Sequence, residues 1–158
     1  MMHRFDVIIV GGGAAGFFCA INAAQKNPKL KIAILERGSS VLEKVRISGG
    51  GRCNVTHSCF VASDLVKFYP RGEKELRGPF HTFGANDTIE WFKNQGVALK
   101  TESDGRMFPT TDSSQTIIDC FLSATAKFNI QVLTAQSVQS LFKKDDMWKV
   151  ETKNDQFI

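Results

Sequence analysis

The stretch Arg4-Phe-Asp-Val-Ile-Ile-Val10, followed directly by Gly11-Gly-Gly-Ala-Ala-Gly16, decides the fold of this chain. Its first part predicts a buried strand, and its second part is a Gly-x-Gly-x-x-Gly turn that opens a helix. Each glycine of this pattern has its own physical task. Gly11 permits a tight turn, Gly13 lets the backbone approach a ligand closely, and Gly16 lets the helix pack on the sheet.

A second apolar strand, Lys31-Ile-Ala-Ile-Leu-Glu36, follows the predicted helix at about 13–26 and ends in an acid. The free N–H groups at the helix start suit an anion such as a pyrophosphate, and the acid suits ribose hydroxyls. We therefore predict a dinucleotide site. Glu36 serves NAD and FAD alike, and it disfavours NADP because a 2′-phosphate would meet a carboxylate.

The length and composition are those of one globular domain without a strong charge bias. The chain has 158 residues, is 42% hydrophobic, and carries 20 basic against 16 acidic residues for a net charge of +4. Such a mild excess helps to hold an anionic cofactor but does not predict nucleic-acid binding. The basic residues between 67 and 77 are interrupted by Glu73 and Glu75, which favours a solvated surface.

An uncharged run over residues 7–24 resembles a signal peptide or a membrane span at first sight. Three consecutive glycines interrupt it, so the dinucleotide pattern accounts for it better than a bilayer does. We expect a cytoplasmic protein that is not bound to a membrane. Cys19 and Cys120 lie on predicted helices and read as small buried residues, and no metal site is predicted.

The rest of the chain completes an α/β fold, a Rossmann-like parallel sheet with helices and an added antiparallel hairpin layer. The predicted elements are an irregular stretch over 59–84, a helix that a capping box starts at 87, a strand at 97–102, a strand or tight hairpin at 105–109, a helix from 111 or 112, a third parallel strand at 130–133, and hairpin strands at 137–143 and 148–153. A sheet of this plan needs a further parallel strand, so we expect a truncated domain.

A second glycine-rich loop, Lys44-Val-Arg-Ile-Ser-Gly-Gly-Gly-Arg-Cys-Asn54, follows the second strand. Its glycines free the backbone to wrap around a ligand, Lys44 and Arg52 offer charge, and Ser48 and Asn54 offer directional hydrogen bonds. This combination predicts a ligand-binding loop.

Together these motifs resemble the bacterial NAD(P)/FAD-dependent oxidoreductases of the aminoacetone-oxidase-like and bile-acid-reducing type. The resemblance rests on Gly11–Gly16, Glu36-Arg37, Lys44 with Ser48–Asn54, and Gly105-Arg-Met-Phe-Pro109. It implies FAD as the tightly held dinucleotide, NAD(P)H as a candidate electron donor, and a small-molecule substrate. It also implies that residues 1–158 are the N-terminal portion of an FAD/NAD(P)-binding domain, without the substrate domain and the C-terminal return.

The resemblance assigns the cofactor contacts to two groups of residues and one isolated position. The turn lies at the pyrophosphate, Glu36 at the ribose, the second loop along the pyrophosphate and flavin, and the main chain of Val138 at the adenine. The implied cofactor-binding residues are Gly11, Gly13, Ala14, Ala15, Gly16, Glu36, Arg37, Lys44, Ser48, Gly49, Gly50, Gly51, Arg52, Cys53, Asn54 and Val138. No catalytic acid or base can be named, and His57 reads as a loop residue.

Three alternatives stay open at this point. The first is a simple NAD-binding dehydrogenase domain. The second is a flavin-linked dithiol or disulfide reductase that uses Cys53 and Cys59, and the third is a non-catalytic nucleotide-binding module. The leading hypothesis is the FAD-binding part of a flavin-dependent oxidoreductase of unknown substrate, with weak or absent turnover by this part alone.

Overall fold

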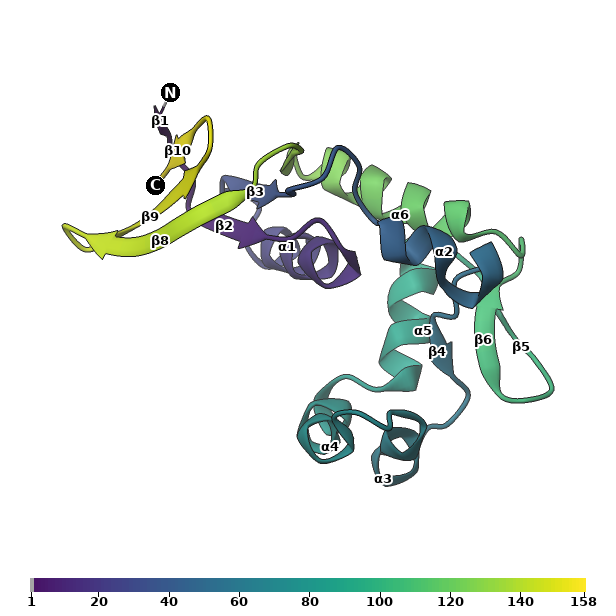
Figure 1. The fold of residues 1–158 in the computed structure, drawn as a ribbon. Coiled ribbons are helices and arrows are strands. Elements are labelled where there is room, and N and C mark those ends of the chain that lie inside the picture. Colours follow the sequence, from purple (N-terminus) through teal and green to yellow (C-terminus); the bar gives the residue numbers. More distant parts are fainter. Residues whose placement is uncertain (1) are drawn as a thin grey trace. The chain divides into compact units, whose positions relative to one another are not determined.

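The computed structural model describes residues 2–158, which form two compact units. The first unit contains the residues up to Lys44 and those from Phe121 onward, and the second unit contains Val45–Cys120. Figure 1 shows the elements of both along the chain.

The first unit contains the parallel sheet that the sequence predicts. Its strands are β2 (Val7–Val10), β3 (Ile32–Leu35) and β7 (Gln131–Leu133), and β3 lies in the middle, parallel to both neighbours. Helix α1 (Ala14–Lys26) connects β2 to β3. The third parallel strand expected at 130–133 is thereby confirmed.

All four residues of β3 are buried, because both of its faces are covered. On one face α1 approaches Ile9 of β2, and Phe17 of α1 packs against Phe121 with ring centroids 5.9 Å apart. On the other face Ala33 and Leu35 pack against Val150 and Phe157. Uninterrupted apolar character is what a central parallel strand requires.

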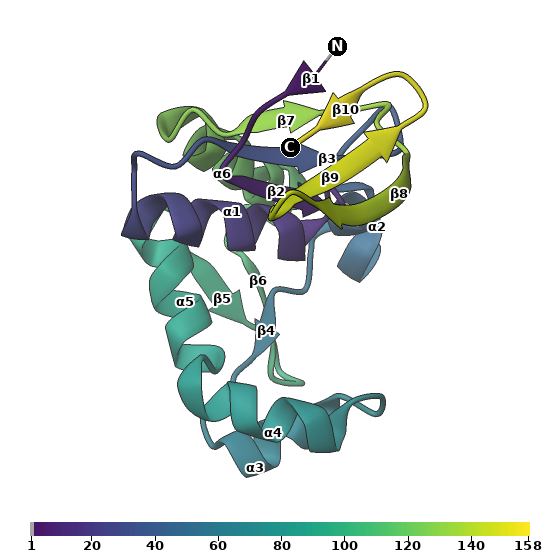
Figure 2. The same cartoon turned by 90° about the vertical axis from the view of Figure 1, so that its left-hand side faces the viewer.

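A second sheet covers that other face with the order β1-β10-β9-β8 (Figure 2). Its strands are β1 (Met2–His3), β8 (Val138–Lys144), β9 (Met147–Thr152) and β10 (Gln156–Phe157). Strands β8 and β9 pair antiparallel, which confirms the predicted hairpin.

The second unit combines short helices with a three-stranded antiparallel sheet of order β4-β6-β5. The elements from the second loop to the third parallel strand are α2 (Glu43–Gly51), β4 (Thr56–His57), α3 (Ala62–Leu65), a 3-10 helix η1 (Val66–Phe68), α4 (Glu73–Thr82), α5 (Ala85–Asn94), β5 (Leu99–Thr101), β6 (Arg106–Pro109) and α6 (Ser114–Lys127).

Several local predictions were wrong in this region. The stretch 59–84 is helical rather than irregular, and α4 contains Pro79 within its length. Helix α5 begins two residues before the expected 87, because Asp87 occupies the third helical position and accepts a hydrogen bond from the N–H of Gly84 at 2.7 Å. Helix α6 begins at Ser114, because Asp112 has a left-handed φ of 54° that no helix can include.

No helix among residues 2–158 is long and apolar enough to cross a membrane. Within the same residues no three His, Cys, Asp or Glu side chains gather as a metal site would require. Cys120 is buried as expected, whereas Cys19 lies on the solvent side of α1 and is exposed.

Candidate cofactor site

The turn between β2 and α1 owes its form to Gly11 and Gly16. Gly11 has φ +112°, a backbone conformation that side chains oppose, and its N–H donates to the carbonyl of Leu35 at 2.8 Å. A Cβ on Gly16 would lie 2.1 Å from the carbonyl oxygen of Gly11. The helix therefore starts as close to the strand end as bare backbone allows.

The start of α1 is open to an anion. Its N-cap is Gly13, no side chain within residues 2–158 caps the helix there, and the first turn contains no acid. The first helical hydrogen bond runs from the N–H of Phe17 to the carbonyl of Gly13 at 3.1 Å. The N–H groups of Ala14, Ala15 and Gly16 precede it, at the positive end of the helix dipole.

Gly13 also leaves room for a ligand. A Cβ built on Gly13 would meet no heavy atom within 4 Å among the described residues outside its immediate surroundings, and the residue is exposed. Open space beside unsatisfied helix N–H groups fits a diphosphate that approaches the backbone closely. The residues of this turn therefore fit the diphosphate of a dinucleotide.

Glu36 lies beside this turn and is held by the backbone on both sides. Its Oε1 accepts from the N–H of Gly38 at 2.7 Å, and its Oε2 accepts from the N–H of Gly12 at 2.8 Å. Hydrogen bonds from Gly38 first, and then from Gly12, hold the pKa of this carboxyl below its ordinary value of 4.5. Each oxygen keeps a second acceptor site, so the ionised group can still accept from hydroxyl groups.

Gly12 is a residue that sequence reasoning missed. A Cβ there would lie 2.8 Å from Cγ1 of Val41 and 2.9 Å from Cβ of Glu36. The available signal was the third consecutive glycine, since the Gly-x-Gly-x-x-Gly pattern leaves this position free.

Three other residues predicted at the cofactor are Arg37, Lys44 and Val138. Arg37 and Lys44 are exposed. Val138 begins β8, is partly buried, and packs against the cluster of Ala33, Leu35, Val150 and Phe157.

The second glycine loop forms a left-handed turn in the second unit. Gly49, Gly50, Gly51 and Cys53 have φ values of 56°, 69°, 86° and 63°, and the N–H of Cys53 donates to the carbonyl of Ser48 at 3.0 Å. Residues Glu43–Gly51 are assigned to α2, but its helical dihedrals end before Ser48. The short helix before the glycines was not predicted.

The loop is built against the other motif, Gly105–Pro109. A Cβ on Gly49 would lie 2.7 Å from Cε1 of Phe108, which is fully buried. The N–H of Val55 donates to the carbonyl of Met107 at 2.9 Å, where β4 and β6 pair. Two of the motifs that carry the resemblance, the second glycine loop and Gly105–Pro109, thus pack against each other.

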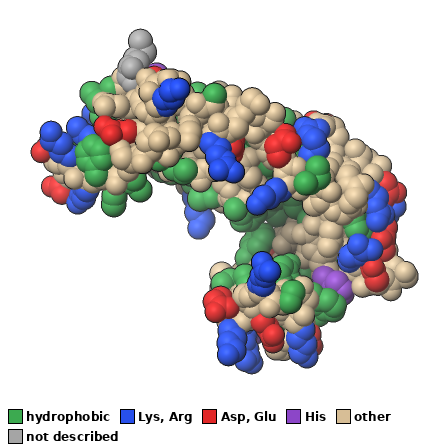
Figure 3. All heavy atoms as spheres, in the orientation of Figure 1, with side chains coloured by type: hydrophobic (Ala, Val, Ile, Leu, Met, Phe, Trp, Pro, Cys, Tyr) green, Lys and Arg blue, Asp and Glu red, His purple; other side chains and the backbone are tan. Residues whose placement is uncertain are grey.

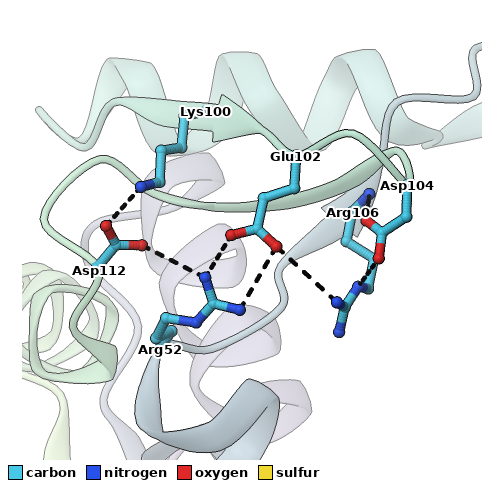
Figure 4. Close-up of polar contacts among 6 residues, drawn as sticks. All are labelled: Arg52, Lys100, Glu102, Asp104, Arg106 and Asp112. Carbon is cyan, nitrogen blue, oxygen red and sulfur yellow. Dashed lines mark hydrogen bonds and ion pairs between the residues drawn. The ribbon is translucent and has the colours of Figure 1, made fainter.

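Arg52 turns toward acidic side chains of the same unit, as Figure 4 shows. Its guanidinium pairs with Glu102, approaches Oδ1 of Asp112 at 3.6 Å, and stacks on the ring of Phe108 at 4.1 Å. The hydrogen bond that Arg52 donates to the carboxylate of Glu102 is the main cause that raises the pKa of Arg52. Neither acid was singled out by the sequence, because Glu102 is fifty residues away along the chain.

Cys53 is poorly suited to a redox pair with Cys59, because its side chain is buried. All four cysteines are free, and Cys53 is 7% exposed. Burial raises the pKa of the Cys53 thiol and so keeps it in the less reactive protonated form. His57 stacks on Phe68 with ring centroids 3.7 Å apart, and its Nε2 lies 3.1 Å from the carbonyl of Asp104.

Comparisons with known proteins agree with this geometry. Residues 5–158 match the family described as HI0933-like protein Rossmann domain. The chain is 31% identical over 144 residues to a ribosomal RNA dihydrouridine synthase of Escherichia coli, covering 91% of this chain and 34% of the relative. It is 27% identical over 140 residues to a 3-dehydro-bile acid delta(4,6)-reductase of Clostridium scindens, covering 89% and 33%. The chain thus spans about a third of the length of these relatives.

Solved structures share the fold at low sequence identity. A 3-ketosteroid-delta4-(5alpha)-dehydrogenase from Rhodococcus jostii superposes with a TM-score of 0.72 at 13% identity, over 98% of this chain and 43% of that one. Quinol fumarate reductase of Escherichia coli superposes with a TM-score of 0.68 at 16% identity, over 99% and 31%. The chain belongs to the HI0933-like Rossmann domain family, and its fold is the FAD-binding Rossmann fold of flavin-dependent oxidoreductases.

Proposed function

We propose that this chain binds FAD and is the cofactor-binding part of a flavin-dependent oxidoreductase. One observation carries the proposal: the uncapped start of α1, with open space at Gly13, lies beside an ionised Glu36 that Gly12 and Gly38 hold in place. The helix start would hold the diphosphate, and Glu36 would accept from the ribose.

On the motif resemblance, we assign further contacts with FAD to Arg37, Lys44, the loop Ser48–Asn54 and the main chain of Val138. The loop supports this assignment because Gly50 is exposed and a Cβ there would meet no described heavy atom within 4 Å outside its immediate surroundings. The main chain at Gly50 is therefore accessible to a ligand. Bound FAD would supply two-electron chemistry, with NAD(P)H as the proposed donor.

We propose that the whole protein reduces a carbon–carbon double bond of a small molecule. The names of both relatives, a dihydrouridine synthase and a delta(4,6)-reductase, denote the addition of hydrogen across such a bond. A further C-terminal part of the same protein would supply the substrate site and the catalytic acid. The cytoplasmic location stays a prediction from the sequence.

The cofactor proposal is tested on the purified natural gene product. We expect flavin absorbance and, after acid release, a small molecule with the mass of FAD. A colourless protein that retains NAD would contradict it and favour the dehydrogenase alternative. Anaerobic oxidation of NADH or NADPH, stimulated by a conjugated enone and not by its saturated analogue, would support the reaction class.

A second candidate substrate is a uridine in RNA, which the surface of α4 favours. Lys74, Arg77 and His81 are spaced along one side of this helix and are exposed. Lys and Arg side chains gather on this part of the molecule, with acidic side chains between them (Figure 3). Phosphate contacts need such cations, although Glu73 and Glu75 reduce the local charge.

The two substrates are distinguished by one binding experiment. Full-length protein is mixed with labelled ribosomal RNA at two salt concentrations, and K74Q/R77Q is compared with K26Q on α1. Salt-sensitive binding that only K74Q/R77Q weakens would favour RNA. Binding that both variants leave unchanged, or no binding, would favour the small molecule.

A further inference from the structure

The guanidinium of Arg52 is surrounded by partners from its own unit. Nη1 pairs with Oε1 of Glu102, Nη2 lies 3.4 Å from Oε2, and Asp112 approaches Nη1 from another direction at 3.6 Å. Phe108 supports the guanidinium at 4.1 Å. A fork held by a carboxylate, beside a second acid and over a ring, has one strongly preferred position.

The two acids are themselves neutralised by other cations. Lys100 pairs with Oδ2 of Asp112, Arg106 lies 3.9 Å from Oε2 of Glu102, and Arg106 donates to Asp104 at 2.7 Å. The network in Figure 4 therefore joins three cations to three anions. Its formal charge is zero, so Arg52 offers little free charge to a phosphate or to a reduced flavin.

The position of Arg52 in the chain gives this network a second consequence. Arg52 separates Gly51 from Cys53, and both of these residues have a left-handed φ. At the other end of the turn Gly49 lies against Phe108, the same ring that supports Arg52. Phe108 and the two acids thus hold both ends of a turn whose left-handed backbone conformation is unfavourable for residues other than glycine.

We propose that Glu102 is a positioning residue for the cofactor loop. It acts through Arg52 and holds the loop Ser48–Asn54 in the left-handed form that presents its N–H groups. The inference rests on the proposed function in one respect only, that this loop contacts FAD. It replaces the expectation that Arg52 contributes its charge directly to the cofactor.

The test compares E102Q with D104N in the flavin-free natural gene product, titrated with FAD. Both variants remove one negative charge from the same network, but Asp104 pairs with Arg106 and not with Arg52. A direct role of Arg52 predicts equal or tighter FAD binding by E102Q, because its charge is released. Positioning predicts binding weakened roughly tenfold or more in E102Q, the effect typical of losing a supporting partner, and unchanged binding in D104N.

A second readout does not depend on flavin. Cys53 follows Arg52 and is buried, so its alkylation rate reports whether the loop holds its shape. Followed by peptide mass spectrometry without FAD, alkylation of Cys53 should be several times faster in E102Q than in the wild type, and unchanged in D104N. Chemical unfolding of each variant shows whether E102Q folds; if it does not, D112N removes the other acid and should act in the same direction.

The outcomes separate the inference from the function on which it rests. Protected Cys53 and unweakened FAD binding in E102Q would overturn the positioning role. Faster alkylation of Cys53 with unchanged FAD affinity in E102Q would show that Glu102 stabilises the loop but that the loop does not contact FAD. If the wild type binds no FAD, the proposed function fails, and the alkylation rates still decide whether Glu102 positions the loop.

Discussion

The backbone N–H of Gly12 donates to Oε2 of Glu36 at 2.8 Å, and the two residues are so close that Gly12 has no room for a side chain. This relationship connects the first glycine turn to the end of the second strand. It also distinguishes Gly12, where packing excludes a side chain, from Gly13, where the open space suits a ligand.

G12A should destabilise the protein even without a cofactor. The new Cβ would lie 2.8 Å from Val41 and 2.9 Å from Cβ of Glu36, an overpacking that costs about 1–3 kcal/mol of the free energy of unfolding. G13A is the matched control, because its Cβ meets nothing among the described residues outside its immediate surroundings. It should leave flavin-free unfolding in urea unchanged and weaken FAD binding; weakened unfolding in G13A, or unchanged unfolding in G12A, would contradict this division.

G16A should be the most harmful alanine substitution in the turn. Its Cβ would lie 2.1 Å from the carbonyl oxygen of Gly11, so α1 must move away from the strand, at a cost we expect to exceed about 3 kcal/mol. Gly78 offers the comparison, since a Cβ there meets no described atom within 4 Å outside its immediate surroundings and the residue lies inside α4. G78A should change the free energy of unfolding by less than about 1 kcal/mol in thermal or urea unfolding, because the helix propensity that alanine gains is offset by the contact of its Cβ with the ring of Pro79. Equal effects of the two substitutions would refute the packing argument.

Glu36 should contribute a pH-dependent part of the stability. Its pKa is lowered in the folded protein, so the contribution is fully present above its ordinary pKa of 4.5 and is lost as the pH falls through the lowered value. The difference in unfolding free energy between the wild type and E36Q should therefore be larger at pH 7 than at pH 3. E90Q, at an exposed position of α5, makes the same charge change and serves as the control. A constant difference for E36Q across this range would show that the backbone hydrogen bonds do not favour the ionised form.

The four cysteines should differ in their rates of alkylation. Cys19 is exposed, whereas burial raises the pKa of Cys53 and raises that of Cys120 to about 11. At pH 8 we expect Cys19 to react first and Cys53 and Cys120 last, with the order lost in concentrated urea, as measured by peptide mass spectrometry. A Cys53 that reacts as fast as Cys19 in the folded protein would revive the dithiol alternative.

The parallel sheet, α1 and the hairpin could be predicted because each rests on a local pattern. Apolar runs mark Val7–Val10 and Ile32–Leu35, and the glycine pattern marks the turn between them. The same applies to Glu36, whose place at the end of a strand is set by its neighbours in sequence. Local patterns thus identified most of the first candidate site.

The helices over 62–82 and the acids that hold Arg52 could not be predicted, because they depend on contacts between distant residues. Pro79 and Gly78 argue against a helix locally, yet Phe80 packs on Tyr69 with ring centroids 5.1 Å apart and favours α4. Glu102 resembles any surface acid until the chain brings it to Arg52. A periodic sequence pattern does not indicate a contact between residues that are so far apart along the chain.

The pairing of β1 with β10 has a consequence for biosynthesis. Met2 lies opposite Gln156 and His3 opposite Phe157, so β1 can pair with its partner only after the ribosome has made the chain through β10. Residues 45–120 are contiguous and need no such delay. We expect the second unit to fold early. The first unit should fold later and more slowly, because its contacts join residues that are far apart along the chain.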